Sequence, residues 1–358
     1  MIVIGTDTHK ATHTAAGVER ASGQLVDELT AAARKQGFEQ LLAWGRRLGP
    51  ERIWAIEDCR HVSGGFERFL VARGERVVRV APRLMGETRK GSRVRGKSDS
   101  IDALAVARAA LKEGPETLPA AQLDRDSLEI KLLLDHREDL VHQRADDQRR
   151  LRWHLHDLWP ELELPAGALD RDKWLDKLSR RLARSEQSVR VEIARELVRA
   201  IRAHVRRERE LERELTLRIQ AKAPQLLELP GCGPLTAAKI VAETAGVERF
   251  ATDAKLARLA GVAPVPASSG RRDRQRLDRG GNRQLNCAFH RLAVAQGRFH
   301  PEARAYLERK QAEGKGRMEA LRWLKRHLVR RVWQLLRAST AITSTPTAIP
   351  APCGIRLT

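Results

Sequence analysis

The sequence contains no long apolar run, no closely spaced cysteines and few aromatic residues. No apolar stretch approaches the ~18 residues of a membrane-spanning helix, so we expect a soluble cytoplasmic protein without a membrane partner. Its four cysteines, at positions 59, 232, 287 and 353, lie too far apart to indicate a disulfide framework or a zinc module. Aromatic residues make up only 4% of the chain, with a single tyrosine, which argues against a base-stacking platform for nucleic acid.

Positive charge is abundant. The 358 residues include 67 Lys and Arg against 46 Asp and Glu, which gives a formal net charge of +21. Such a chain binds polyanions at low salt, and nucleic acid is the natural partner. A hydrophobic content of 42% is enough for two or three domains with cores of their own.

The first hundred residues alternate between strand-like and helix-like patterns. Short apolar runs at 2–6, 52–56 and 77–80 predict strands, and the stretches near 35–48 and 64–73 predict helices between them. This alternation is typical of an α/β domain.

Acidic residues stand at positions where such a fold brings side chains together. Asp7 and Glu57 end the first two predicted strands, and the segment 98–105 has the composition of a helix start. Asp99 and Asp102 lie three residues apart, on one face of that helix. If these four carboxylates converge, they need a cation, and hard oxygen ligands favour Mg²⁺ or Mn²⁺. The alternative is that Asp99 only caps the helix and the other acids are surface residues.

Residues 120–222 have a different character, and prolines at 115, 119, 160 and 165 bracket long charged segments. Apolar residues recur at helical spacing among these charges and predict a helical arm: Ile193, Leu197, Ile201, Val205, Leu211, Leu215 and Ile219. Pairing as a coiled coil is compatible with the repeat, which is too irregular to fix the partner number.

A glycine-containing turn follows the arm. The segment Leu229-Pro-Gly-Cys-Gly-Pro234 and the helix start after it are typical of a helix-hairpin-helix element, in which Gly231 and Gly233 would present backbone N–H groups to a phosphate. A plain helix-to-helix turn is the other interpretation.

Hydroxyl groups stand beside guanidinium groups further along the chain. Ser268-Ser269-Gly270 precedes Arg271, Arg272 and Arg274. Because arginine binds phosphate oxygens in a bidentate manner, this pattern points to phosphodiester chemistry. A solvated turn would account for it equally simply.

These motifs together resemble one family, the DEDD transposases of insertion sequences, which are bridge-RNA-guided serine recombinases. Six segments carry the resemblance, in order: Gly5-Thr6-Asp7-Thr8-His9-Lys10, Ile56-Glu57, Lys97-Ser98-Asp99-Ser100-Ile101-Asp102-Ala103, Leu229-Pro-Gly-Cys-Gly, Leu259-Ala-Gly-Val-Ala-Pro264 leading to Ser269-Gly270, and Arg279-Gly-Gly-Asn-Arg283. The sequence departs from the family at Asp58-Cys59-Arg60, where small residues are more usual.

The resemblance implies a domain order and a set of site residues. Residues 1–125 would form an α/β domain of RuvC/RNase H-like fold, 126–222 a coiled-coil-like helical arm, 223–338 a mainly helical transposase domain, and 339–358 a flexible tail. Ser269 would be the nucleophile, and the acidic tetrad that holds Mg²⁺ or Mn²⁺ would be Asp7, Glu57, Asp99 and Asp102.

The resemblance also implies an activity and partners. The enzyme would cut and rejoin DNA at the element ends and the target, guided by a structured RNA, in the nucleoid of a bacterial cell. It would act as a homo-oligomer, a dimer or a tetramer, and the long arm would let the tetrad and the serine of one site come from different subunits.

Two other functions fit the residues. The first is a metal-dependent nuclease or junction resolvase that uses the tetrad alone, with Ser269 as an ordinary loop residue. The second is a DNA- or RNA-binding protein without catalysis, for which the charge and the glycine turn would suffice.

Overall fold

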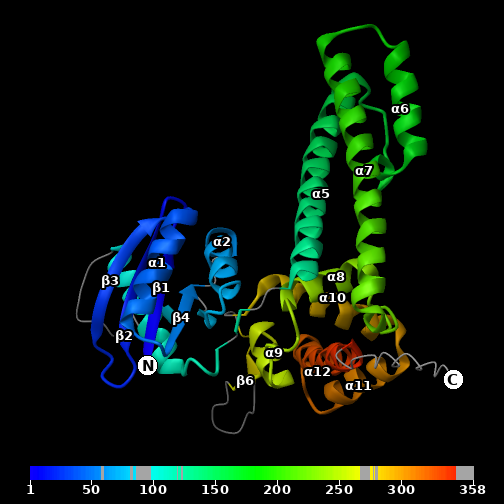
Figure 1. Ribbon diagram of the computed structural model, residues 1–358. Coiled ribbons are helices and arrows are strands. Elements are labelled where there is room, and N and C mark those ends of the chain that lie inside the picture. Colours follow the sequence, from blue (N-terminus) through cyan, green and yellow to red (C-terminus); the bar gives the residue numbers. More distant parts are fainter. Residues whose placement is uncertain are drawn as a thin grey trace, which may run out of the picture. The chain divides into compact units, whose positions relative to one another are not determined.

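The computed structural model describes residues 1–57, 60–80, 84–85, 98–118, 120–121, 124–266, 275–276, 278 and 281–343 (Figure 1). By its internal packing the chain falls into two compact units. Residues 1–124, 246–265 and 276–281 form the first, and residues 125–245, 266–275 and 282–358 form the second. The three consecutive domains expected from the sequence stay a prediction. The packing groups residues 246–265 and 276–281, which belong to the third expected domain, with the first unit.

The first unit contains a mixed five-stranded sheet. Its strands are β1 (Ile2–Thr8), β2 (Thr12–Glu19), β3 (Leu25–Ala32), β4 (Arg52–Glu57) and β5 (Val77–Val80), in the spatial order β3-β2-β1-β4-β5. The first three strands are antiparallel, whereas β4 and β5 run parallel to β1. The expected α/β architecture and its three predicted strands are confirmed. β2 and β3 were not predicted.

Helices cover both faces of this sheet. On one face α1 (Lys35–Leu48) and α2 (Arg60–Val71) pack on a core that includes Ile4, Trp54 and Ile56. On the other face α4 (Asp99–Glu113) packs on Val3 and Ala55. Because side chains alternate along a strand, Asp7 and Glu57 project on the same face as Val3 and Ala55, which is the face covered by α4.

The approach of α4 to β1 is close at Gly5. A Cβ atom at this glycine would lie 2.2 Å from the backbone oxygen of Ala103 and 2.3 Å from the backbone nitrogen of Ala107. The face of α4 that meets the sheet consists largely of buried alanines, including Ala110, which lets the helix backbone reach the strand. Any side chain at position 5 would therefore push α4 off the sheet.

The second unit begins with long helices. α5 (Arg125–Leu158) and α7 (Val189–Lys222) each contain 34 residues, or about 50 Å of helix at ~1.5 Å per residue. They run antiparallel, since Arg218 pairs with Glu129 near one end and Arg144 pairs with Glu208 further along. α6 (Asp172–Arg184) packs beside them (Figure 1).

The apolar stripe predicted on α7 is buried with one exception. Its residues from Leu197 to Ile219 lie in the interior, and Ile193 is 38% exposed. Two short 3-10 helices, η1 (Ala168–Asp170) and η2 (Pro224–Leu226), lie at bends of the chain.

The remaining elements follow the glycine turn. They are α8 (Pro234–Thr244), α9 (Asp253–Leu259), α10 (Arg283–Phe299), α11 (Pro301–Ala312), α12 (Arg317–Thr343), and the two-stranded sheet of β6 (Val265–Pro266) and β7 (Gln275–Arg276). Within the described ranges, no helix combines the length and the apolar character needed to cross a membrane.

The contact at Gly5 leads to a stability prediction. We expect Gly5→Ala to lower the free energy of unfolding by about 1–3 kcal/mol or more, because the new methyl group overlaps the α4 backbone. The matched control is Gly65→Ala within α2, where a Cβ meets only Phe38 at 3.8 Å and alanine favours the helix. Urea denaturation of both variants measures the difference. Equal stability of the two would contradict the close packing of α4 on β1.

Candidate active site: the acidic cluster beneath helix α4

The first turn of α4 carries two of the predicted acids. Ser98 caps this helix, and its hydroxyl accepts a hydrogen bond from the backbone N–H of Ile101 at 3.3 Å. Asp99 is therefore not the cap, and its carboxylate is available for other contacts. Asp102, one turn further on, is buried at 7% exposure.

Asp7 lies where β1 ends beneath this turn. It is only 5% exposed, and its Oδ2 lies 3.1 Å from Nε2 of His9. The same His9 nitrogen lies 3.4 Å from Oδ1 of Asp99. One potential ligand atom from each of these three residues falls within 4.8 Å of the others.

The electrostatics of Asp7 reflect this crowding. Burial raises the pKa of its carboxyl group, and the negative charges of Asp102 and Asp99 raise it further. His9 acts in the opposite direction through its charge and hydrogen bond, but the net pKa of Asp7 is raised. Ionised Asp7 is thus destabilised by burial and by the neighbouring negative charges.

Glu57 joins the cluster through strand register. The last registered pair between the parallel strands β1 and β4 is Thr6 with Ile56, so Asp7 and Glu57 follow at the next position. Both belong to the face covered by α4, and Glu57 is half-buried. The fold therefore brings all four predicted acids to one edge of the sheet. Strand register places Glu57 there. The effect of the Asp99 and Asp102 charges on the pKa of Asp7 shows that these three lie close together.

His9 is the residue that sequence reasoning missed. It follows Asp7 by two positions and lies at the turn into β2, where its backbone N–H donates to Thr12 O at 2.9 Å. Its side chain is 51% exposed. The sequence did contain a signal for it, because residues two apart in an extended chain project to the same side, as Asp7 and His9 do.

The donor set fits a divalent cation with hard oxygen ligands. Carboxylates from the ends of two strands and the first turn of one helix lie at one edge of the sheet, and that of Asp7 is buried with a raised pKa. Mg²⁺ and Mn²⁺ prefer such oxygen donors, and imidazole is a better ligand for softer metals. His9 is accordingly placed to hydrogen-bond the carboxylates rather than to serve as a main ligand.

The glycine turn lies in the second unit. Gly231 has a φ of 78°, in the left-handed region that favours glycine, and Gly233 is the N-cap residue of α8. Both are exposed, and the turn is fixed by Gln296, whose Nε2 donates to Pro230 O at 2.8 Å. Cys232 between them is buried, and burial raises the pKa of its thiol to about 12, so it is not a nucleophile at neutral pH.

Ser269 and the arginines at 271, 272 and 274 lie outside the described residues, but the chain on both sides of them is described. β6 and β7 pair directly before and after this segment. Further on, a Cβ at Gly281 would lie 2.2 Å from the backbone nitrogen of Gly261, so two of the motifs seen in the sequence meet backbone to backbone.

Asn282 anchors the start of α10. Its Oδ1 accepts hydrogen bonds from the N–H groups of Gln284 and Leu285, at 3.0 and 3.1 Å. Its Nδ2 donates to Glu243 on α8 at 2.6 Å. The segment that carries the serine is therefore followed by a helix whose first turn is held by side-chain hydrogen bonds.

Comparison with known proteins gives a consistent result. A DEDD transposase model of the IS110 type matches residues 4–160, and the model described as "Transposase IS116/IS110/IS902 family" matches residues 223–308. The chain belongs to this transposase family. It is 27% identical to the 44.8 kDa protein of insertion element IS116 from Streptomyces clavuligerus, with 96% of this chain and 97% of that protein covered.

Two other relatives come from insertion elements as well. The 42 kDa protein of IS900 from Mycobacterium paratuberculosis is 26% identical over 93% of this chain and 95% of its own length. The 43.6 kDa protein of IS110 from Streptomyces coelicolor is 28% identical over 73% and 74%.

The two matched segments contain the two candidate sites of this IS116/IS110/IS902-family transposase. The first includes the acidic cluster, and the second includes the glycine turn and position 269. Membership in a transposase family implies an enzyme that binds, cuts and rejoins DNA.

The raised pKa of Asp7 predicts how Asp7→Asn changes stability with pH in EDTA. Because the folded-state pKa lies above the unfolded value, the ionised carboxylate destabilises the fold above the folded pKa, and this penalty disappears as the pH falls toward 4. Asp7→Asn should therefore be more stable than wild type at pH 8, and the two should converge near pH 4.

Urea denaturation at each pH measures this difference, and Asp126→Asn, at an exposed carboxylate on α5, is the control. An Asp7→Asn variant that is less stable than wild type at pH 8 in EDTA would contradict the proposed origin of the pKa shift. Adding Mg²⁺ should reverse the order, because only the wild type keeps the full ligand set.

Proposed function

We propose that this transposase cuts and rejoins DNA through Ser269, assisted by a divalent metal ion held by Asp7, Glu57, Asp99 and Asp102. The observation that carries the proposal is the convergence of these acids at one edge of the sheet, with Asp7 buried and its pKa raised by burial and by the neighbouring charges. Burying ionisable groups of like charge is costly unless a cation is part of the site.

A RuvC-like first domain is part of the proposal. Three features support it: a mixed sheet in which β1 and β4 run parallel, one acid at the carboxyl end of each of these strands, and a second pair of acids on the helix that crosses them. In such an arrangement the strands fix two ligands and the helix fixes two more, so that the geometry does not depend on a flexible loop.

The chemistry assigned to Ser269 is a transesterification. Its Oγ attacks a backbone phosphorus, the new Oγ–P bond forms as the P–O3′ bond breaks, and the departing 3′ oxygen takes up a proton. Attack by the 3′-hydroxyl of another strand on the phosphoserine reverses the step, so no ATP is consumed. Arg271, Arg272 and Arg274 would bind the phosphate oxygens and offset the developing negative charge. The metal ion, when bound, would supply further charge stabilisation at the phosphate.

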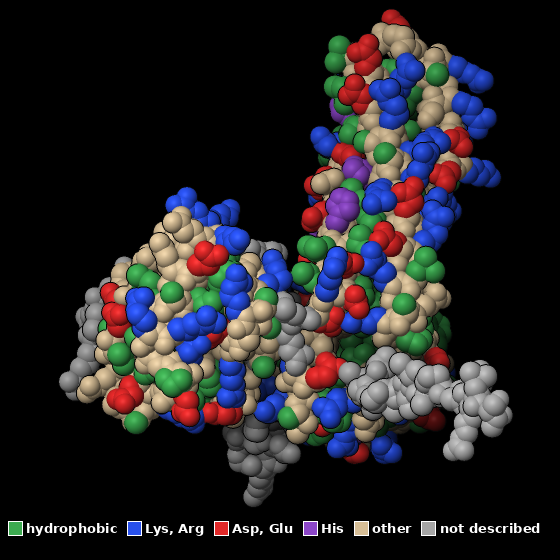
Figure 2. Space-filling view, viewed as in Figure 1, with side chains coloured by type: hydrophobic (Ala, Val, Ile, Leu, Met, Phe, Trp, Pro, Cys, Tyr) green, Lys and Arg blue, Asp and Glu red, His purple; other side chains and the backbone are tan. Residues whose placement is uncertain are grey.

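The partners proposed are DNA and a guide RNA, bound by a homo-oligomer. The net charge of +21 supports polyanion binding in general. Figure 2 shows Lys and Arg side chains along the outer edge of α6, a helix that contains five basic and two acidic residues. The exposed backbone at Gly231 and Gly233, at the N-terminus of α8, is suited to contact a phosphate.

The test is covalent capture of DNA. We expect Ser269→Ala to abolish the protein–DNA adduct seen on denaturing gels while leaving DNA binding within about twofold of wild type, because one hydroxyl contributes little to the affinity for a polyanion. Ser268→Ala is the matched control and should retain the adduct.

Two results would overturn the assignment. An adduct that persists in Ser269→Ala and disappears in Ser268→Ala would move the nucleophile by one residue. Strand cleavage by Ser269→Ala without any adduct would identify a nuclease that uses the acidic cluster alone.

A further inference from the structure

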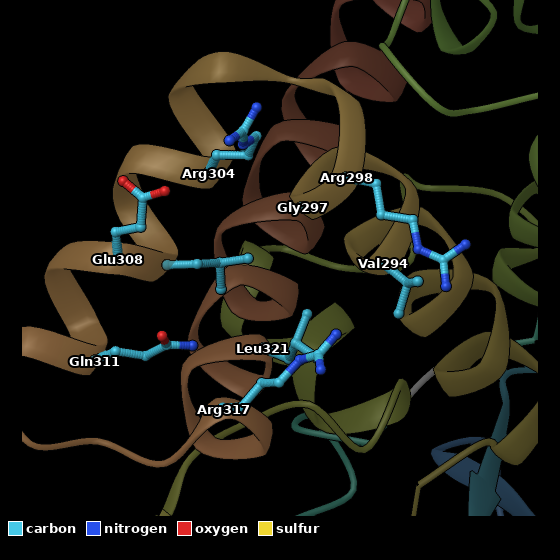
Figure 3. A pocket seen from close by; sticks show the side chains of 9 residues that line it. Val294, Gly297, Arg298, Arg304, Glu308, Gln311, Arg317 and Leu321 are labelled. Atoms are coloured by element: carbon cyan, nitrogen blue, oxygen red, sulfur yellow. The ribbon is translucent and has the colours of Figure 1, made fainter.

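Three arginines line a cavity between the last helices of the second unit. Arg298 comes from the last turn of α10, Arg304 from the first turn of α11, and Arg317 is the first residue of α12. The cavity has a volume of about 190 Å³ and an apolar wall that includes Val294 and Leu321 (Figure 3). Gly297 is in contact with α11, since a Cβ there would lie 2.8 Å from Cδ1 of Leu307.

Among the residues that the structure describes, none of these three arginines has a salt-bridge partner, and all three are exposed. Several arginines of the arm do form such pairs, as Arg144 does with Glu208. The cavity lining contains one acid, Glu308, against three arginines, so it keeps an excess of two positive charges.

The position of Arg317 strengthens the case for an anion. A cation at the N-terminus of a long helix opposes the helix dipole, which favours negative charge there. α12 contains 27 residues and begins with this arginine. An anionic ligand in the cavity would interact favourably with both the guanidinium group and the helix terminus.

An exposed aromatic ring adjoins the cavity. Phe299, the last residue of α10, is 82% exposed, more than any other large hydrophobic residue recorded in the described chain. It lines a second cavity of about 330 Å³ together with His290 and Arg291. Val294 and Arg298 belong to the walls of both cavities, so the cavity that Phe299 lines adjoins the cavity of the three arginines along α10.

We propose that this surface binds one unpaired nucleotide of a single strand. The base stacks on Phe299, and the adjoining phosphate binds Arg298, Arg304 and Arg317. Rings that stack on bases and arginines that bind the backbone are the two components of single-strand recognition. A low aromatic content does not exclude this, because a single exposed ring is enough for a single nucleotide. The proposal rests on the nucleic-acid binding in the proposed function and is independent of Ser269.

The test measures binding of labelled 12-residue oligonucleotides by fluorescence anisotropy, in a Ser269→Ala background so that no cleavage interferes. Phe299→Ala should weaken binding of a single strand by roughly fivefold or more, whereas Phe299→Trp should retain it. Neither change should alter binding of a duplex or of an abasic strand, which offer no exposed base. Arg298→Gln should weaken binding of the normal and the abasic single strand alike.

Matched controls lie on the arm. Trp153→Ala removes a ring that is 72% exposed on α5, and Arg199→Gln removes an exposed charge on α7. Thermal melting checks that all variants fold, which the exposure of Phe299 leads us to expect. The proposal fails if Phe299→Leu binds as well as wild type, or if Trp153→Ala and Arg199→Gln cause the same losses as the pocket variants.

RNA and DNA are separate arms of the test. Oligouridine and oligodeoxyuridine of equal length share bases and phosphates and differ in the 2′-hydroxyl. A Phe299-dependent affinity for either one supports the site, and the tighter of the two identifies the source of the strand. If neither binds more tightly to wild type than to Phe299→Ala, the site is refuted. The two proposals fail separately. If the DNA adduct does not depend on Ser269 but single-strand binding still depends on Phe299, the proposed serine chemistry is refuted and the nucleotide site is not.

Discussion

The contact between β1 and α4 at Gly5 is the constraint on which the acidic cluster depends. With no side chain at this position, the backbone of α4 reaches the strand, and the first turn of the helix comes to lie over the end of β1. Asp99 and Asp102 then face Asp7, and their charges add to the effect of burial on its pKa. The same contact that organises the cluster thus creates an electrostatic cost that a bound cation would offset.

Much of this arrangement could be predicted from the sequence. The apolar runs that became β1, β4 and β5 have both faces covered, and such strands read as continuous hydrophobic segments. The ends of these strands and the helix start at Ser98 then place four acids near one edge. Because β1 and β4 pair in parallel with Thr6 opposite Ile56, the next residues, Asp7 and Glu57, lie beside each other.

Other features could not be predicted, for identifiable reasons. β2 is buried along most of its length, but its middle is Ala15-Ala16-Gly17, and alanine and glycine are depleted in strands. β3 is an edge strand that is mostly exposed, and its sequence Leu-Val-Asp-Glu-Leu-Thr-Ala-Ala does not alternate between apolar and polar residues. The surface around Phe299 depends on the packing of three helices, and its arginines belong to different elements. The spacing of residues along the sequence therefore could not predict that these side chains come together.

The central claim is that the acidic cluster binds a divalent metal ion. Electron paramagnetic resonance of added Mn²⁺ tests it most directly, since the six-line signal of the free ion is lost on binding. We predict that one equivalent of wild-type protein removes this signal, that Asp102→Asn leaves most of it, and that Asp172→Asn, at a surface acid on α6, behaves like wild type. If Asp102→Asn binds Mn²⁺ as tightly as the wild type, or if the wild type leaves the signal unchanged, the cluster is not a metal site and the account is wrong.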